Sequence, residues 1–128
     1  MKKFFYILAA AALVLGLSSC NGKIENPTAR NFIGTWDLNK IETTTPGGSV
    51  TTTPVKTLDY LVIADGTISI YEADKLSRSG SFAVKDNVIF IDGVSYYTVE
   101  SLSRKEMILS QNGLGILVSG YKYYYTKR

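Results

Sequence analysis

The sequence predicts an all-β protein: one eight-stranded antiparallel up-and-down barrel, preceded by a signal peptide. Three observations lead to this fold class. Apolar and polar residues alternate at period two over much of the chain after residue 34, as in half-buried strands. Short turn pairs of Asp, Asn and Gly separate these runs, which is typical of hairpins. No segment after the N-terminal apolar run keeps a helical period.

Residues 1–19 are predicted to form the signal peptide. The chain opens with a basic stretch, Met1–Lys3, and continues with an uncharged apolar run, Phe4–Leu17. Because a membrane span needs about 20 apolar residues, this run is short for a transmembrane anchor. A basic start, an apolar run and small residues before a cleavage site together indicate secretion.

The end of the signal, Leu17-Ser18-Ser19-Cys20, resembles the lipobox of bacterial lipoproteins. The resemblance implies that Cys20 carries lipid, that the chain is cut before it, and that the protein is attached to a membrane. Each buried methylene of an acyl chain contributes roughly 0.8 kcal/mol, so several chains give lasting attachment. The alternative is an ordinary signal followed by a free cysteine, which is uncommon in exported proteins.

The tether after the lipidation site carries information on localisation. Asn21 stands where enterobacterial lipoproteins kept in the inner membrane have Asp, so we expect attachment to the outer membrane, with the leaflet left open. Residues 20–27 form the lipidated cysteine and a polar tether, and residues 28–128 form the barrel domain. Loss of Lys2 and Lys3 with the signal leaves 12 basic and 11 acidic residues, and this balance argues against a nucleic-acid partner.

The domain is predicted to begin with one helical turn at residues 28–33, followed by strands. Residues 43–49 and 73–78 are predicted as loops. Residues 51–54 are β-branched but end in Pro54, which suits only an edge strand or a strand entrance. The runs predicted as the eight strands are 34–42, 57–64, 67–72, 79–84, 88–91, 94–102, 105–111 and 116–126.

Several short motifs resemble those of small bacterial lipocalin-like lipoproteins. Gly34-Thr35-Trp36 is similar to the Gly-x-Trp signature of lipocalins. The further motifs, in matching order, are Ala64-Asp65-Gly66, Tyr97-Thr98-Val99, Glu106–Leu109 and a Tyr-rich end. The resemblance implies a barrel in which Trp36 plugs one end beneath a basic residue from the last strand. Lys127 and Arg128 are the candidates for this cation–π contact, which together with Gly34 and Trp36 defines the barrel end.

Catalysis is not expected, because the chain has no histidine and a single cysteine. These counts exclude Ser-His and Cys-His nucleophiles and most zinc or iron sites. Most of the Asp residues stand at turns or strand ends, where they normally serve the turn. We therefore expect neither enzyme activity, nor a metal, nor a cofactor.

A tyrosine row is the most suggestive feature for binding. By strand alternation Tyr121, Tyr123 and Tyr125 share one face, which suits ligand or protein recognition but also packing at a core edge. The leading hypothesis is a small apolar or amphipathic ligand held inside the barrel. The alternative is a filled barrel whose outer face binds an envelope protein, as an inhibitor or accessory subunit. The residues predicted to line the ligand site are Tyr60, Val62, Tyr71, Phe82, Phe90, Met107 and Tyr123.

Overall fold

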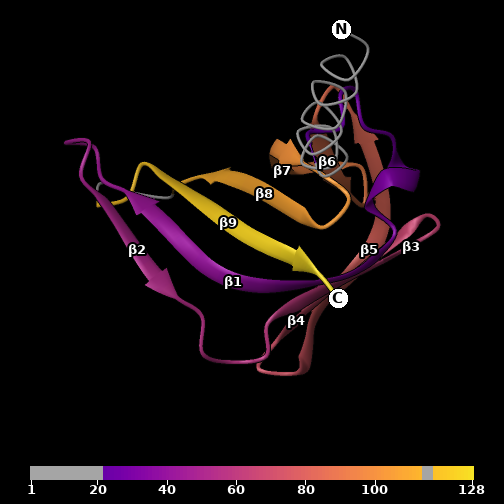
Figure 1. Ribbon diagram of the computed structural model, residues 1–128, viewed down its shortest axis with the longest axis horizontal. Helices are drawn as coiled ribbons and strands as arrows, with labels where there is room; N and C mark the ends of the chain where they lie inside the picture. The colour runs from indigo at the N-terminus through magenta and orange to yellow at the C-terminus, as the bar shows by residue number, and fades with distance from the viewer. Residues whose placement is uncertain (1–21, 114–116) are drawn as a thin grey trace, which may run out of the picture.

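The computed structural model describes residues 22–113 and 117–128 (Figure 1). Its fold is the predicted one, an all-β, closed, eight-stranded antiparallel up-and-down barrel. The predicted signal peptide and Cys20 lie outside the described residues. Within the described ranges, no helix has the length and apolar character needed to cross a membrane.

Each barrel strand pairs with its neighbours in sequence, and the pairing of β1 with β9 closes the barrel. The predicted helical turn is present as the 3₁₀ helix η1 (Ala29–Phe32). The strands of the barrel are β1 (Gly34–Thr44), β3 (Tyr60–Ala64), β4 (Thr67–Glu72), β5 (Lys75–Lys85), β6 (Val88–Ile91), β7 (Val94–Leu102), β8 (Glu106–Asn112) and β9 (Gly120–Lys127).

A ninth strand, β2 (Val50–Pro54), pairs only with the second half of β1, and all its residues are exposed. The Val55 N–H donates to the Asn39 carbonyl at 2.8 Å. Antiparallel alternation then directs the backbone of Thr52 and Pro54 toward the free edge. Pro54 therefore loses no ladder hydrogen bond, which explains why this edge strand tolerates it.

The hairpins are tight because their turn residues accept positive φ. The predicted loop at 73–78 is wrong: Ala73 and Asp74, at φ 50° and 61°, complete the turn, and β5 already begins at Lys75. Positive φ at both central residues matches the twist of the flanking strands. Two other hairpins use the same geometry at Asp86-Asn87 and Asp92-Gly93.

The core fills the half of the barrel next to η1, which we call the closed end. Buried apolar side chains from all eight barrel strands form one cluster there, and Ile68, Ile89 and Ile91 have no exposed surface. Phe32 of η1 caps this end and meets Phe82 edge-on, with ring centres 5.8 Å apart. This half of the interior is occupied by the protein's own side chains.

The opposite end, which we call the mouth, is splayed. The ladder between β7 and β8 runs only as far as Thr98 and Ser110. Beyond that pair, β8, β9, β1 and β2 continue together as an extension that we call the arm, on the left of Figure 1. In the described chain, the arm and the first residues of β7, 94–97, therefore have no ladder pairing between them.

Candidate functional site

Three of the four residues predicted for the barrel end, Gly34, Trp36 and Lys127, lie together. The buried Trp36 indole N–H donates to the Phe32 carbonyl at 2.8 Å. The Lys127 Nζ lies 5.5 Å from the centre of the Trp36 ring. Gly34 has φ +144°, and a Cβ added there would lie 2.5 Å from the Lys127 Cε, so a side chain at this position would meet the lysine stem.

Arg128, the second candidate for this contact, lies elsewhere. Its guanidinium pairs with Asp37 at 2.7 Å and stands 4.8 Å over the ring of Tyr60, on the outer face of the barrel. Successive strand residues point to opposite faces, so only one of two adjacent basic residues reaches the Trp36 ring. That residue is Lys127.

Three of the seven predicted ligand-lining residues face the interior. Phe82 and Met107 belong to the packed core, with 6% and 1% of their surface exposed. Tyr123 packs against the core near the mouth and is only half-buried. Of these three, only Tyr123 lies at the mouth, where its ring contacts those of Tyr97 and Tyr121.

The interior prediction is wrong for the other four. Tyr60, Val62, Tyr71 and Phe90 alternate with the buried residues of β3, β4 and β6, which places them on the outer face. Tyr60 and Tyr71 are cross-strand partners whose rings stack there, 4.6 Å apart. Because these strands carry apolar residues on both faces, the sequence pattern does not indicate which alternate residues point inward.

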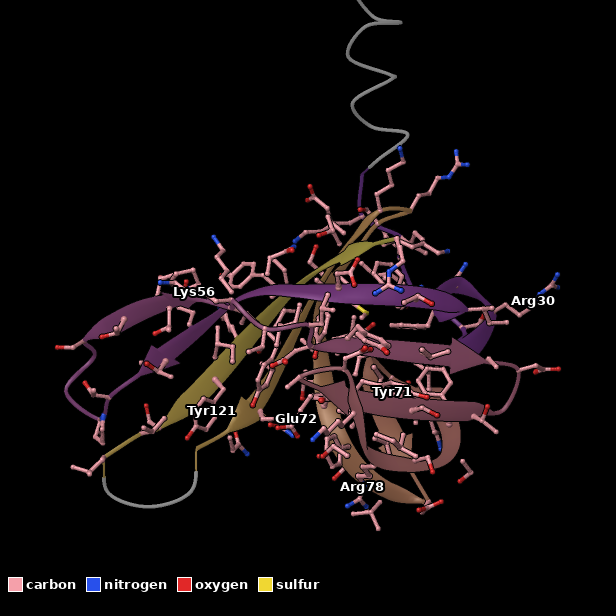
Figure 2. All side chains as sticks on the ribbon, turned by 90° about the horizontal axis from the view of Figure 1, so that it is seen from below. Arg30, Lys56, Tyr71, Glu72, Arg78 and Tyr121 are labelled. Carbon is pink, nitrogen blue, oxygen red and sulfur yellow. The ribbon has the colours of Figure 1, made fainter. Side chains whose placement is uncertain are left out.

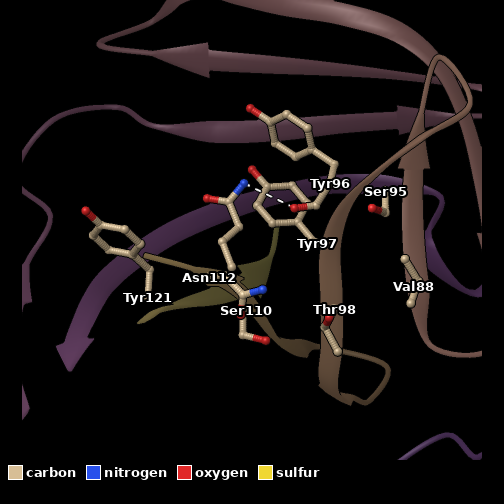
Figure 3. A pocket seen from close by; sticks show the side chains of 9 residues that line it. Val88, Ser95, Tyr96, Tyr97, Thr98, Ser110, Asn112 and Tyr121 are labelled. Atoms are coloured by element: carbon tan, nitrogen blue, oxygen red, sulfur yellow. Dashed lines mark hydrogen bonds between the residues drawn. The ribbon is translucent and has the colours of Figure 1, made fainter. Parts of the chain in front are cut away.

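An open groove of about 450 Å³ lies at the mouth, where β7 and β8 diverge (Figure 3). The Gln111 side chain bridges the gap. Its Nε2 donates to the Tyr96 carbonyl at 3.2 Å, and its Oε1 accepts from the Tyr123 hydroxyl at 2.7 Å. The groove is lined by Val88, Ser95, Tyr96, Tyr97, Thr98, Ser110, Gln111, Asn112 and Tyr121.

Tyrosines from two separate parts of the sheet meet at this groove. The rings of Tyr96 and Tyr97 are edge-on at 4.7 Å, and Tyr97 meets Tyr123 at 5.8 Å. Tyr121 stacks on Tyr123 at 6.2 Å, as expected for two residues that share one face. Tyr96 is not among the residues predicted from the sequence. It has no partner in the β6–β7 ladder because of the register shift between Ile89 and Phe90, and strand alternation does not predict such a shift.

Burial raises the pKa of three tyrosine hydroxyls in the core and at the mouth. It raises the pKa of Tyr123 to about 12, with a smaller contribution from the neighbouring Tyr121. Burial also raises the pKa of Tyr97 and of Tyr125 well above the usual value of 10. The shifts follow from the low exposure of these side chains, which disfavours the charged phenolate.

Two charged side chains stand beside the tyrosines. The Arg78 guanidinium lies 5.2 Å from the centre of the Tyr96 ring. Glu72 accepts a hydrogen bond from the Ser77 hydroxyl at 2.8 Å. Figure 2 shows Tyr121 on the arm and Glu72 and Arg78 on the barrel side of the opening. The mouth thus combines aromatic faces and hydroxyl groups with charged side chains of both signs.

Comparison with protein-family models, curated proteins and solved structures gives no match. The lipocalin-like and lipoprotein resemblances therefore remain predictions from the sequence motifs. Among the described residues, no group of three or more His, Cys, Asp or Glu side chains is arranged to hold a metal ion.

Proposed function

We propose that this protein is a non-catalytic binding protein, attached to the outer membrane through lipid on Cys20, that takes a small amphipathic ligand. The tyrosine-lined groove at the mouth is the observation that carries the proposal. Because the closed end is filled by core side chains, the ligand sits at the mouth rather than deep in the barrel.

The composition of the groove suits such a ligand. Ring faces of Tyr96 and Tyr121 offer apolar contact, while phenol hydroxyls and polar side chains such as Ser95 and Gln111 offer hydrogen bonds. Its volume of about 450 Å³ lies within the usual range for small-molecule sites. The absence of histidine from the sequence supports binding without catalysis.

Ligand binding is tested with a matched pair of tyrosines on β9. Tyr121 faces the groove, whereas Tyr124 lies on the outer face, where its hydroxyl donates to Glu42 and Lys40 covers its ring. Titration with the amphipathic fluorophore anilinonaphthalene sulfonate should show Tyr121→Ala binding about tenfold more weakly, a change of ~1.4 kcal/mol. The Tyr124→Ala variant should bind as the parent does.

Equal losses in both variants, at unchanged denaturation midpoints, would contradict the mouth site. Native mass spectrometry of the purified protein gives an independent check, because a bound natural ligand should add its mass to a smaller fraction of Tyr121→Ala than of the parent. An equal fraction in the two proteins would place the ligand elsewhere.

Lipid attachment is tested separately. The Cys20→Ala variant should leave the membrane fraction, and the parent should carry the added mass of a diacylglycerol on its mature N-terminal residue. Equal membrane retention of the variant would contradict the anchor.

A protein-interaction role is the second candidate, and one outer patch favours it. Leu58 and Leu76 are 60% and 57% exposed beside the stacked Tyr60 and Tyr71. Large exposed apolar side chains gathered around aromatic rings are typical of protein-binding surfaces. A photo-crosslinker at position 76 should then yield an adduct in intact cells that one at Val94, also 61% exposed, does not.

A further inference from the structure

The closed end of the barrel carries a concentrated basic surface. A groove of about 580 Å³ lies there, and every charged residue that lines it is basic. We call this surface the basic pole. The acidic neighbours in sequence, Glu25 and Glu106, do not line it. The lining residues are Ile24, Arg30, Asn31, Arg104, Lys105, Lys127 and Arg128.

The charges of the basic pole are directed at solvent. Arg30, Arg104 and Lys105 are all exposed. Within residues 22–113 and 117–128, the ion pair found joins Arg128 to Asp37 and does not involve these three residues. Since the predicted mature chain has almost as many acidic as basic residues, this accumulation reflects local placement rather than net charge.

The N-terminal tether leaves the domain at the same pole. Ile24 lines the groove, and its N–H donates to the Leu102 carbonyl at 2.6 Å. Gly22, the first described residue, is two residues from Cys20. Two extended residues reach at most about 7 Å, so lipid on Cys20 would bring this end of the barrel to the bilayer surface.

We propose that the basic pole binds the phosphate groups of anionic lipid headgroups, so that the barrel stands on the membrane with its mouth pointing away. The orientation rests on the proposed anchor at Cys20, whereas the headgroup contact rests on the basic groove itself. Exposed Lys and Arg side chains are attracted to an anionic bilayer over about one Debye length, ~10 Å at 0.1 M salt. Arg30, Arg104 and Lys105 lie within that range when the pole meets the surface.

Headgroup binding is measured on the segment 21–128, which lacks Cys20 and therefore carries no lipid anchor. The described strands and core residues lie within this segment, so it retains the barrel. Co-sedimentation should show binding to vesicles of equal parts phosphatidylglycerol and phosphatidylcholine but not to phosphatidylcholine alone. Raising the salt should abolish the binding, because screening removes the attraction.

Paired substitutions locate the contact. Arg104→Ala/Lys105→Ala should weaken binding about 25-fold, since each basic residue contributes roughly fivefold near an anionic surface. Lys75→Ala/Lys122→Ala removes the same charge from exposed positions near the mouth and should change binding less than about twofold.

Equal losses in the two double variants, or equal binding to both vesicle types, would overturn the headgroup contact. Neither result depends on Cys20, because the segment carries no lipid. Membrane release of Cys20→Ala therefore tests the anchor alone, and the two proposals fail separately.

Discussion

Lys127 lies across the indole of Trp36, with its Nζ 5.5 Å from the ring centre, and joins the last strand to the first at the closed end. The Trp36 ring is fully buried and its N–H is bonded to Phe32. The lysine stem therefore covers the ring while its ammonium group reaches solvent. This contact stabilises the closed end of the barrel, where β1 pairs with β9.

Removal of the contact between Lys127 and Trp36 should destabilise the barrel. Lys127→Ala loses both the cation–π contact and the covering stem, and we expect a loss of about 1–2 kcal/mol in the free energy of unfolding. Lys122→Ala, on the exposed side of the same strand, should change it by less than about 0.5 kcal/mol. Urea denaturation measures both, and equal losses would contradict the contact.

Gly34→Ala should be destabilising for a conformational reason. Its φ of +144° is strained for any side chain, at a cost of about 1–3 kcal/mol. The clash with the Lys127 Cε is relieved by a shift of the flexible lysine. We therefore expect Gly34→Ala to keep most of its penalty in a Lys127→Ala background, and a penalty that vanishes there would assign the effect to the clash.

The ion pair of Arg128 with Asp37 should contribute little despite its 2.7 Å distance. The two side chains are 53% and 38% exposed, and solvent strongly screens the attraction between such exposed charges. Arg128→Ala should therefore lower the free energy of unfolding by less than Lys127→Ala does. The opposite order would show that Arg128 is the more important of the two terminal basic residues.

Alkaline pH should destabilise the fold. The pKa values of Tyr97, Tyr123 and Tyr125 are raised in the folded protein, chiefly by burial, so folding favours the protonated phenols. Their stabilisation is complete below the unfolded pKa of 10 and falls as the pH rises through the folded values, of which that of Tyr123 is about 12. Denaturation midpoints measured from pH 8 upward should fall above pH 10.

The Tyr97→Phe variant tests the origin of this alkaline effect. It removes one buried ionisable hydroxyl, so its midpoint should fall less steeply than that of the parent. Parallel curves for the two proteins would show that Tyr97 contributes nothing to the alkaline loss.

The barrel itself was predictable from sequence because alternation and turn residues both act locally. The strands 67–72, 88–91 and 94–102 have the predicted bounds. The start of β5 was missed because Lys75 to Ser79 are all exposed and carry no alternating apolar pattern. Two other strands also begin later than predicted. The strand predicted from residue 57 is β3, which begins at Tyr60, and the last strand, β9, begins at Gly120.

The candidate site was less predictable, because it depends on which face of a strand is buried. Leu61 and Val62 are equally apolar, yet only Leu61 enters the core. Register shifts added a second source of error. Tyr96 reaches the mouth from an unpaired position in the β6–β7 ladder, and alternation along a single strand carries no information on such a shift.

The Gln111 side chain links two strands, β7 and β8, where their ladder of backbone hydrogen bonds has ended. Beyond Thr98 and Ser110, side-chain rather than ladder hydrogen bonding links β8 to β7 in the described chain. Segments held by few hydrogen bonds open at lower free energy than core strands. Amide hydrogens of the arm, which extends beyond the buried core, should therefore exchange with solvent before those around Ile89.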